Sequence, residues 1–335
     1  AIGWSKEKIG SHIVRHNVIS DCEQTGICGS LGAVYSQITD NHIHNIWAKR
    51  QFAGAEMAGI KLHGAIDVLI ARNRIHNAGR ALWMDWMAQG TRITRNLCYE
   101  NTTDDLFVEV NHGPFLVDNN VFLSPTSLRD WSQGGAYAHN LFTGVIAAGQ
   151  ELRRATPYHP AHATTVAGRV NIPGGDNRWY NNVFVGPAAA PPAPKQGETS
   201  NRGQRFVGPG LWVYDTREHP SPAAGNVYYR NARPSARETD ALALPQIDPQ
   251  VNLVTEGDRV FLQAQFGTGP AQAATQRVTT ELLGRARVPN VSFENPDGSP
   301  LAIDTDYFGQ PRAAPRPTAG PFESAGASAQ KLKIW

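Results

Sequence analysis

The sequence predicts an all-β chain folded as a right-handed parallel β-helix, with loops inserted between its coils and an extended C-terminal tail. Three observations lead to this prediction. A short phrase centred on Asn recurs about every 23 residues, the segments between its copies alternate like β-strands, and turn-forming residues are abundant. Gly and Pro number 32 and 23 of the 335 residues, which disfavours a bundle of helices.

The recurring phrase consists of a polar residue, an Asn and then alternating apolar positions. Successive Asn residues are separated by 24, 32, 23, 24, 20, 42 and 44 positions, so the short separations define one coil and the long ones a coil with an inserted loop. We expect these loops near 47–58, 148–176 and 187–212. In a β-helix, stacked Asn side chains at a tight turn satisfy backbone groups and tolerate left-handed backbone angles, so we interpret them as scaffold. The repeated residues are Asn17, Asn41, Asn73, Asn96, Asn120, Asn140, Asn182 and Asn226.

The segments between the Asn residues have a period of two and are rich in β-branched and aromatic residues. Examples are Val68–Ile70, Leu106–Val110 and Val121–Leu123. A repeat of this length also occurs in leucine-rich repeat proteins, but the Leu-x-x-Leu-x-Leu spacing is missing. The parallel β-helix is the fold that remains.

We divide the chain into a β-helix catalytic region over 1–230 and terminal coils with a C-terminal tail over 231–335. The tail is richer in Pro, Ala, Gln and Arg, and one short helix is expected near 279–286. The sequence begins in the middle of the coil pattern without a capping segment. Because the ends of a solenoid need a cap, we expect it to be the C-terminal portion of a longer protein.

Charge and composition narrow the classes of function. Lys plus Arg number 31 against 29 Asp plus Glu, a net charge of +2, so the basic footprint of a nucleic-acid-binding protein is missing. No run approaches the length of about 18 apolar residues that a membrane span needs. The motifs of phosphate, dinucleotide and nucleophile-elbow sites are absent from the sequence, so no cofactor is expected, apart from structural Ca²⁺ as an alternative. A homo-oligomer is compatible with the sequence, and nothing in it assigns a compartment.

The three cysteines are too few for a disulfide framework. We interpret Cys22, Cys28 and Cys98 as small buried hydrophobes, with one small loop closed by Cys22 and Cys28 as the alternative. Cysteine chemistry is therefore not expected to define the function.

Two carboxylates, Asp85 and Glu109, hold the same register in consecutive coils. Each lies eleven residues before a repeated Asn, so they are 24 residues apart. Equivalent positions of adjacent coils are roughly 4.8 Å apart, and their side chains leave the same face. A retaining glycosidase needs two carboxyls about 5–5.5 Å apart, one to attack the anomeric carbon and one, with a raised pKa, to protonate the leaving oxygen. The alternative is that both residues bind Ca²⁺ or take separate salt bridges.

Tryptophans near this pair favour a sugar site, because aromatic rings can cover the apolar faces of sugars. By strand alternation, Trp83 shares a face with Asp85 and is the expected platform, whereas Trp86 points the other way and is expected in the core. Trp131, one coil after Glu109, either extends the groove or serves packing.

Polar side chains on the same coils are suited to bind sugar hydroxyls. By alternation, Asn111 shares the face of Glu109, and His112 marks the turn after it. One coil before Asp85, His63 is expected to stack beside that carboxylate. Glu56 lies on the loop leading into this coil, where it either accepts hydrogen bonds from a sugar or is simply a solvated acid.

The 148–176 insertion carries Tyr158 and His159, which are suited to line a sugar pocket. A loop of this length in a solenoid is usually functional. Zn²⁺ bound by His159 and His162 would lack a clear third ligand, so no metal site is predicted.

These stretches resemble glycoside hydrolase family 120, β-xylosidases built on a parallel β-helix. The resemblance covers roughly residues 55–185, and its Asp-to-Glu block is fairly specific. The tail segment Asp304–Arg312 also looks like the closing segment of such enzymes. The resemblance rests on Gly59–His63, Trp83–Thr91, Leu106–Asn120 and the loop with Tyr158 and His159.

The resemblance implies that Asp85 is the nucleophile and Glu109 the acid/base, with retention of configuration, and that Glu56 contacts the substrate. An exo-acting β-xylosidase on xylo-oligosaccharides is therefore expected. One departure concerns sugar recognition, because Ala55 stands where the family leads us to expect a His before Glu56. The alternatives are another β-helix carbohydrase (an α-L-fucosidase, a xylanase or a polysaccharide lyase) and a non-catalytic carbohydrate-binding β-helix.

Overall fold

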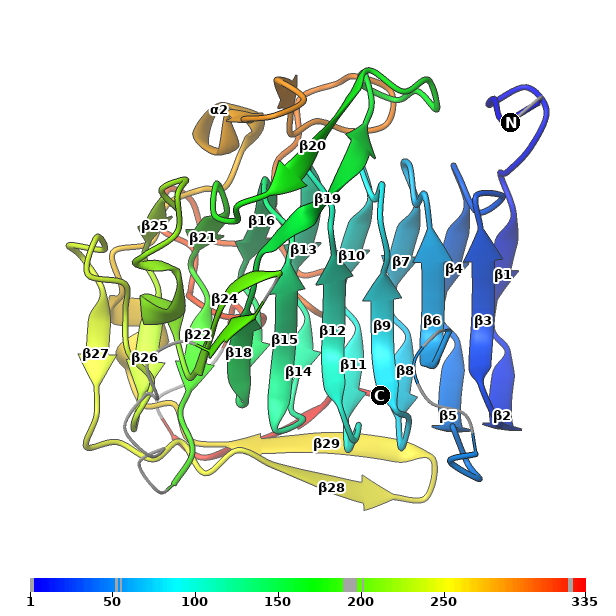
Figure 1. The fold of residues 1–335 in the computed structure, drawn as a ribbon. Helices are drawn as coiled ribbons and strands as arrows, with labels where there is room; N and C mark the ends of the chain where they lie inside the picture. Colours follow the sequence, from blue (N-terminus) through cyan, green and yellow to red (C-terminus); the bar gives the residue numbers. More distant parts are fainter. Residues whose placement is uncertain (1–2, 52–53, 55, 189–197, 201, 325–327) are drawn as a thin grey trace.

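A computed structural model describes residues 3–51, 54, 56–188, 198–200, 202–324 and 328–335 (Figure 1). Three sheets, called A, B and C below, run along the molecule. The first six coils contribute one strand to each sheet, and the later coils contribute parallel strands only to sheets A and B. The strands of successive coils pair in parallel as a right-handed β-helix, which confirms the predicted fold class. Among the described residues, no helix has both the length and the apolar character needed to cross a membrane.

The strands of the three sheets have the following bounds, in spatial order. Sheet A contains β1 (Ile13–Arg15), β4 (Gln37–Thr39), β7 (Leu69–Ala71), β10 (Arg92–Thr94), β13 (Phe115–Asp118), β16 (Gly135–Ala138), β21 (Arg178–Tyr180) and β25 (Ala223–Ala224). Sheet B contains β2 (Val18–Cys22), β5 (His42–Ile46), β8 (Arg74–His76), β11 (Leu97–Tyr99), β14 (Val121–Phe122), β17 (Leu141–Phe142), β22 (Val183–Val185), β26 (Val227–Tyr229) and β27 (Leu242–Leu244). Sheet C contains β3 (Thr25–Ser30), β6 (Ala58–His63), β9 (Arg80–Met84), β12 (Asp104–Glu109), β15 (Thr126–Trp131) and β18 (Val145–Ala148), followed by the antiparallel β24 (Gly203–Gly208) and β23 (Glu198–Ser200).

Side chains that point inward from the sheets fill the lumen of the β-helix and form its core. A column of aromatic rings shows how the repeat builds this core: Phe122 stacks on Phe142 at 5.4 Å between ring centroids, Phe142 on Phe184 at 5.2 Å, and Phe184 on Tyr228 at 5.0 Å. These residues occupy one register position in consecutive strands of sheet B. Such offset ring pairs add about 0.5–1.5 kcal/mol each beyond the burial of their area.

The eight repeated Asn residues form one continuous hydrogen-bonded column, as the spacing predicts. Each Nδ2 donates to the Oδ1 of the next Asn at 2.9 or 3.0 Å, from Asn17 to Asn226. The column ends where Asn226 donates to Glu238 Oε1 at 2.8 Å.

The left-handed backbone angle, however, belongs to the residue before each Asn and not to the Asn itself. This turn residue reverses the direction of the chain, and the Asn that follows is thereby directed inward, onto the column. The residues concerned are His16, Asp40, Arg72, Arg95, Asn119, His139, Asn181 and Gly225.

Replacing an Asn in the middle of the column is expected to cost much more stability than replacing the one at its exposed end. Asn120 is fully buried and donates to Ile93 O and Asp118 O as well as to the next Asn. Asn120→Ala should therefore lower the free energy of unfolding by about 2–4 kcal/mol, because it leaves several buried groups without partners. Asn17→Ala, at the exposed end, should cost less than about 1 kcal/mol. Chemical denaturation of both variants tests this, and equal losses would contradict it.

The inserted segments form two hairpins and a short 3-10 helix. β19 (Glu151–Tyr158) and β20 (Gly168–Ile172) pair as an antiparallel hairpin within the predicted 148–176 insertion. β23 and β24 form the second hairpin, and η1 (Leu211–Tyr214) follows it. The first hairpin follows β18 of sheet C along the chain, and β24 of the second hairpin pairs antiparallel with β18.

The C-terminal segment folds back onto the β-helix. It contains β28 (Asn252–Glu256), β29 (Arg259–Ala264), α1 (Gly269–Gln272), α2 (Thr280–Leu283), β30 (Arg285–Ala286), β31 (Val291–Ser292) and β32 (Gln330–Lys333). α2 lies within the range where a short helix is predicted. Figure 1 shows β28 and β29 roughly perpendicular to the strands of the three sheets, so that they pass over several coils.

Apolar side chains of this segment cover the outer faces of two sheets. One cluster joins residues of β29 and β32 and their neighbours to sheet B, and a second joins residues around α2, β30 and β31 to sheet A. Among the described residues, neither cluster includes side chains of sheet C. These two clusters therefore do not cover the outer face of sheet C, which carries both predicted carboxylates, Asp85 and Glu109.

Candidate active site

Asp85 and Glu109 stand at equivalent positions on sheet C. In β9 and β12, Trp83 pairs with Phe107 and Met84 with Val108, so the residues that follow, Asp85 and Glu109, continue the same register. This confirms the predicted register of the pair. Both side chains are largely buried, with 11% and 14% of their surface exposed. Such a pair of partly buried acids on one face is costly unless each carboxylate has its own compensating partners.

The carboxylate of Asp85 is held by three donors. His63 Nε2 lies 2.8 Å and Lys61 Nζ 3.1 Å from Oδ2, and the backbone N–H of Trp86 donates to Oδ1 at 2.8 Å. His63 comes from the coil before, at the position predicted to stack beside Asp85. The two oxygens are therefore fixed in orientation, and the ammonium of Lys61 compensates the negative charge.

Lys61 is the centre of this network. Its side chain is only 1% exposed, and its Nζ lies 2.6 Å from Glu56 Oε2 and 3.1 Å from Asp85 Oδ2. A buried ammonium requires such partners, because an unpaired charge in a protein interior costs several kcal/mol. The structure thus brings Glu56 to the site through Lys61.

Glu56 keeps part of its carboxylate in reach of solvent, with 31% of the side chain exposed. Cys28 Sγ lies 3.6 Å from the same oxygen that meets Lys61. The interpretation of Cys28 as a buried hydrophobe is wrong, since it is exposed beside this carboxylate, while Cys98 is buried and Cys22 partly so. Ala55, at the position of the expected His, lies outside the described residues.

Glu109 has surroundings of a different kind. The indole N–H of Trp83 donates to Oε2 at 3.0 Å, and Nη2 of Arg154 lies 3.6 Å from Oε1. Burial, and then the negative charge of Asp85, raise the pKa of Glu109, while Arg154 and the indole act in the opposite direction. When two carboxyl groups lie in such different environments, one can act as a charged group while the other acts as a proton donor.

Trp83 contacts the pair as predicted, but its ring faces are already occupied. The ring stacks on Phe107 at 5.4 Å between centroids, and the charged groups of Lys61 and Arg80 lie 4.8 Å and 4.6 Å from its centroid. The residue is 7% exposed. Its role here is therefore to donate a hydrogen bond to Glu109, and the expected sugar-stacking platform does not fit this arrangement.

Trp86, in contrast, is partly exposed, so its predicted place in the core is wrong. Its ring meets that of His63 edge-on at 5.9 Å between centroids. β9 ends at Met84, and the regular alternation of a strand does not continue through Asp85 to Trp86. Trp86 is thus the tryptophan beside Asp85 that keeps an accessible surface.

Asn111 does not share the face of Glu109, which corrects the prediction from alternation. β12 ends at Glu109, and the left-handed angle of Val110 (φ 51°) turns the next side chain inward. Asn111 is fully buried, accepts a hydrogen bond from Ala88 N at 2.7 Å and donates to Met84 O at 3.0 Å. It is a structural residue that joins adjacent coils.

His112 and Tyr158 fasten the insertion to the β-helix. His112 is buried between the amide of Gln133, 3.0 Å from Nδ1, and the hydroxyl of Thr156, 3.0 Å from Nε2. Burial lowers the pKa of His112 to about 4, so the ring is neutral near pH 7. Tyr158 meets this ring edge-on at 5.8 Å between centroids. His112 and Tyr158 thus join the turn to the insertion, and the hydrogen-bond partners of His112 are Gln133 and Thr156 and not Asp85 or Glu109.

His159 has a similar structural place. Its backbone N–H donates to Gln89 Oε1 at 3.1 Å, and the amide of Gln89 donates back to His159 O at 2.8 Å. Its Nδ1 lies 2.9 Å from Thr165 O, and burial lowers its pKa. The side chain is therefore directed into the insertion, which explains why a loop of this length holds a defined position.

Arg154 is the residue of the site that the sequence patterns do not reveal. It lies in the inserted hairpin, 45 residues after Glu109, and no repeat or motif links the two positions. The signal that points to it is indirect: the insertion is long, and it carries two adjacent Arg residues. Only the folding of the hairpin against sheet C shows which of them reaches the acid.

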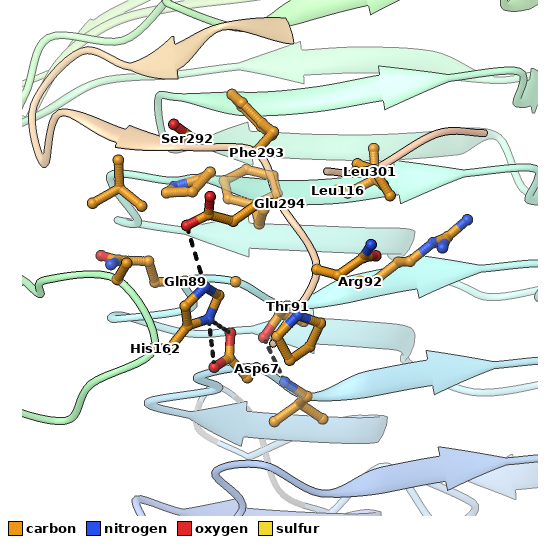
Figure 2. A pocket seen from close by; sticks show the side chains of 18 of the residues that line it. Asp67, Gln89, Thr91, Arg92, Leu116, His162, Ser292, Phe293, Glu294 and Leu301 are labelled. Carbon is orange, nitrogen blue, oxygen red and sulfur yellow. Dashed lines mark hydrogen bonds and ion pairs between the residues drawn. The ribbon is translucent and has the colours of Figure 1, made fainter. Parts of the chain in front are cut away.

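A separate cavity of about 230 Å³ lies beside sheet A, between the insertion and the C-terminal segment. Figure 2 shows His162 between two carboxylates there: its Nδ1 is 2.9 Å from Asp67 Oδ2 and its Nε2 is 3.3 Å from Glu294 Oε1. Apolar groups such as Leu116 and Phe293 line the rest. None of the predicted site residues lines this cavity, and the hydrogen bonds of His162 join the insertion to both the β-helix and the C-terminal segment.

Within the part of the chain that the structure describes, no group of three or more His, Cys, Asp and Glu side chains is placed to hold an ion. The ammonium of Lys61 lies between the carboxylates of Glu56 and Asp85 and balances their negative charge in the place of a metal ion.

Comparison with known proteins supports the fold. Residues 7–146 match the family described as "Right handed beta helix region". The chain is similar to a solved structure of XylC in complex with xylose, with a TM-score of 0.91 and 39% sequence identity. The match covers 100% of this chain and 53% of that one, so the chain spans about half the length of XylC. A search of curated proteins gave no match.

Proposed function

We propose that this chain is a retaining glycoside hydrolase, a β-xylosidase that releases xylose from the end of xylo-oligosaccharides. The observation that carries the proposal is the pair of Asp85 and Glu109, at one register on sheet C and in contrasting environments. The sugar is inferred from the resemblance to glycoside hydrolase family 120 and from the similarity to a protein solved with xylose.

The reaction would proceed by double displacement. Asp85 attacks the anomeric carbon while Glu109 donates its proton to the departing oxygen, so the glycosidic bond breaks as an ester to Asp85 forms. Glu109, now a carboxylate, then takes a proton from water, whose oxygen attacks the same carbon and releases Asp85. Two inversions give net retention.

The surrounding residues would prepare this chemistry. Lys61 and His63 hold Asp85 in one orientation and balance its charge before the attack. The accessible part of Glu56 is available to accept hydrogen bonds from sugar hydroxyls. Burial of Glu109 favours its protonated form, which is the form that the first step consumes.

The stereochemistry of the product tests the proposal. An aryl β-xyloside, which releases a single xylose, is incubated with the protein, and the anomeric protons are followed by NMR before mutarotation is complete. We expect β-xylose to appear first. Release of α-xylose first would show inversion and overturn the roles of Asp85 and Glu109.

A panel of substrates tests the choice of sugar. Aryl β-xyloside, α-L-fucoside and α-L-arabinofuranoside are compared, and we expect turnover of the β-xyloside. Formation of an unsaturated uronate from pectic polymers would indicate a lyase instead. Binding of oligosaccharides without turnover, persisting when both carboxylates are replaced by Ala, would indicate a binding module.

A further inference from the structure

The inserted hairpin β19–β20 places one half-exposed guanidinium next to the acid of the site. Arg154 Nη2 lies 3.6 Å from Glu109 Oε1, and 52% of the Arg154 side chain is exposed. The adjacent Arg153 takes a different partner, with its Nε 3.8 Å from Glu151 Oε1 on the same strand. Arg154 is thus the residue of this pair that faces the site.

The hairpin is fixed at several points, so the position of Arg154 is defined by the fold. At the start of β19, Leu152 N donates to Arg202 O of the second insertion at 2.9 Å. Toward its end, the hydroxyl of Thr156 meets His112 at 3.0 Å, and His159 is held by Gln89. Arg154 lies between these anchors.

The two oxygens of Glu109 have different neighbours. Oε2 accepts the hydrogen bond of the Trp83 indole, which is nearly buried, and Oε1 is the oxygen next to Arg154. A general acid must contact the leaving oxygen, so the leaving group lies on the side of Glu109 and not of Asp85. A partly exposed guanidinium at the acid is therefore next to the leaving group and not next to the sugar that Asp85 attacks.

We propose that Arg154 binds the leaving-group sugar of the substrate and so makes the site selective for glycosides whose leaving group is itself a sugar. This inference rests on the proposed function and adds the recognition of the leaving group. The guanidinium offers several N–H donors in one plane, which suits neighbouring hydroxyl oxygens of a sugar ring. An aryl leaving group offers no such acceptors.

The kinetic test compares two substrates in three variants. Arg154→Ala should lower kcat/KM for xylobiose by about 10–100-fold, the range expected for the loss of one or two charge-assisted hydrogen bonds. The aryl β-xyloside should change less than about threefold. Arg154→Lys should restore part of the loss. Arg169→Ala, an exposed Arg on β20 of the same hairpin, should leave both substrates unchanged.

Binding provides a second readout that does not require turnover. In an Asp85→Asn background, calorimetry should show that Arg154→Ala weakens xylobiose binding about tenfold and leaves xylose binding unchanged. Equal losses on both substrates or both ligands, or no loss on either, would overturn the inference. Wild-type turnover of both substrates keeps these outcomes distinct from failure of the proposed function, and thermal melting confirms that each variant is folded.

Discussion

Asp85→Ala should lower kcat/KM for an aryl β-xyloside by on the order of 10⁴-fold or more, because the variant has no group to form the covalent intermediate. The loss should be as large for good leaving groups as for poor ones, since every substrate needs the nucleophile. Steady-state kinetics measures it. Glu100→Gln, which changes an exposed carboxylate in the coil between the two acids, is the matched control and should keep full activity.

Azide should identify the role of Asp85 through the product it forms. The space left by Asp85→Ala lies at the face of the sugar that the nucleophile attacks, so azide placed there would react by a single displacement. The expected product is therefore the α-glycosyl azide, with inverted configuration. Near-normal turnover in this variant, or a β-glycosyl azide, would contradict the assignment of Asp85 as nucleophile.

Glu109→Gln should reveal the acid through its dependence on the leaving group. Without a proton donor, kcat/KM for xylobiose is expected to fall by about 10²–10⁴-fold. Activated aryl xylosides, whose leaving groups need little protonation, should lose much less in the glycosylation step. Here azide replaces the water of the second step, so the product should be the β-glycosyl azide. Comparable losses for all leaving groups would argue against this role.

The pH profile provides an independent check on Glu109. Burial and the charge of Asp85 raise the pKa of Glu109, so the proton that the reaction needs stays bound to a higher pH than on an ordinary Glu. In the wild type, kcat/KM should fall as the pH rises through this raised pKa. The alkaline decline should disappear in Glu109→Gln, because Gln does not titrate, and a decline that persisted would assign the proton to another group.

The parts of the molecule that the sequence predicts are those governed by the coil period. The Asn column and the register of Asp85 with Glu109 follow from counting residues, because equivalent positions in neighbouring coils lie side by side in any parallel β-helix. The same counting places His63 beside Asp85. These relations need no knowledge of how loops fold.

Predictions failed where a strand ends or where an insertion folds over the coils. Alternation put Asn111 beside Glu109, yet the left-handed turn at Val110 directs it inward. Alternation also put Trp86 in the core, although β9 ends before it. Arg154 could not be found at all, since its contact with the acid depends on the path of a hairpin that has no period.

The Asn column also has a direction. Every side-chain amide donates toward the higher-numbered coil, so the amide dipoles add, and the positive end of the sum meets the carboxylate of Glu238. Along the column, each hydrogen bond polarises its neighbours, as in other aligned chains of amides. A coil added beyond Glu238 would place the carbonyl oxygen of its Asn against the Glu238 carboxylate, and the two would repel each other. A coil added before Asn17 would instead place the N–H donor of its Asn next to the carbonyl oxygen of Asn17. The polarity of a single side-chain type thus allows the solenoid to lengthen at one end and stops it at the other.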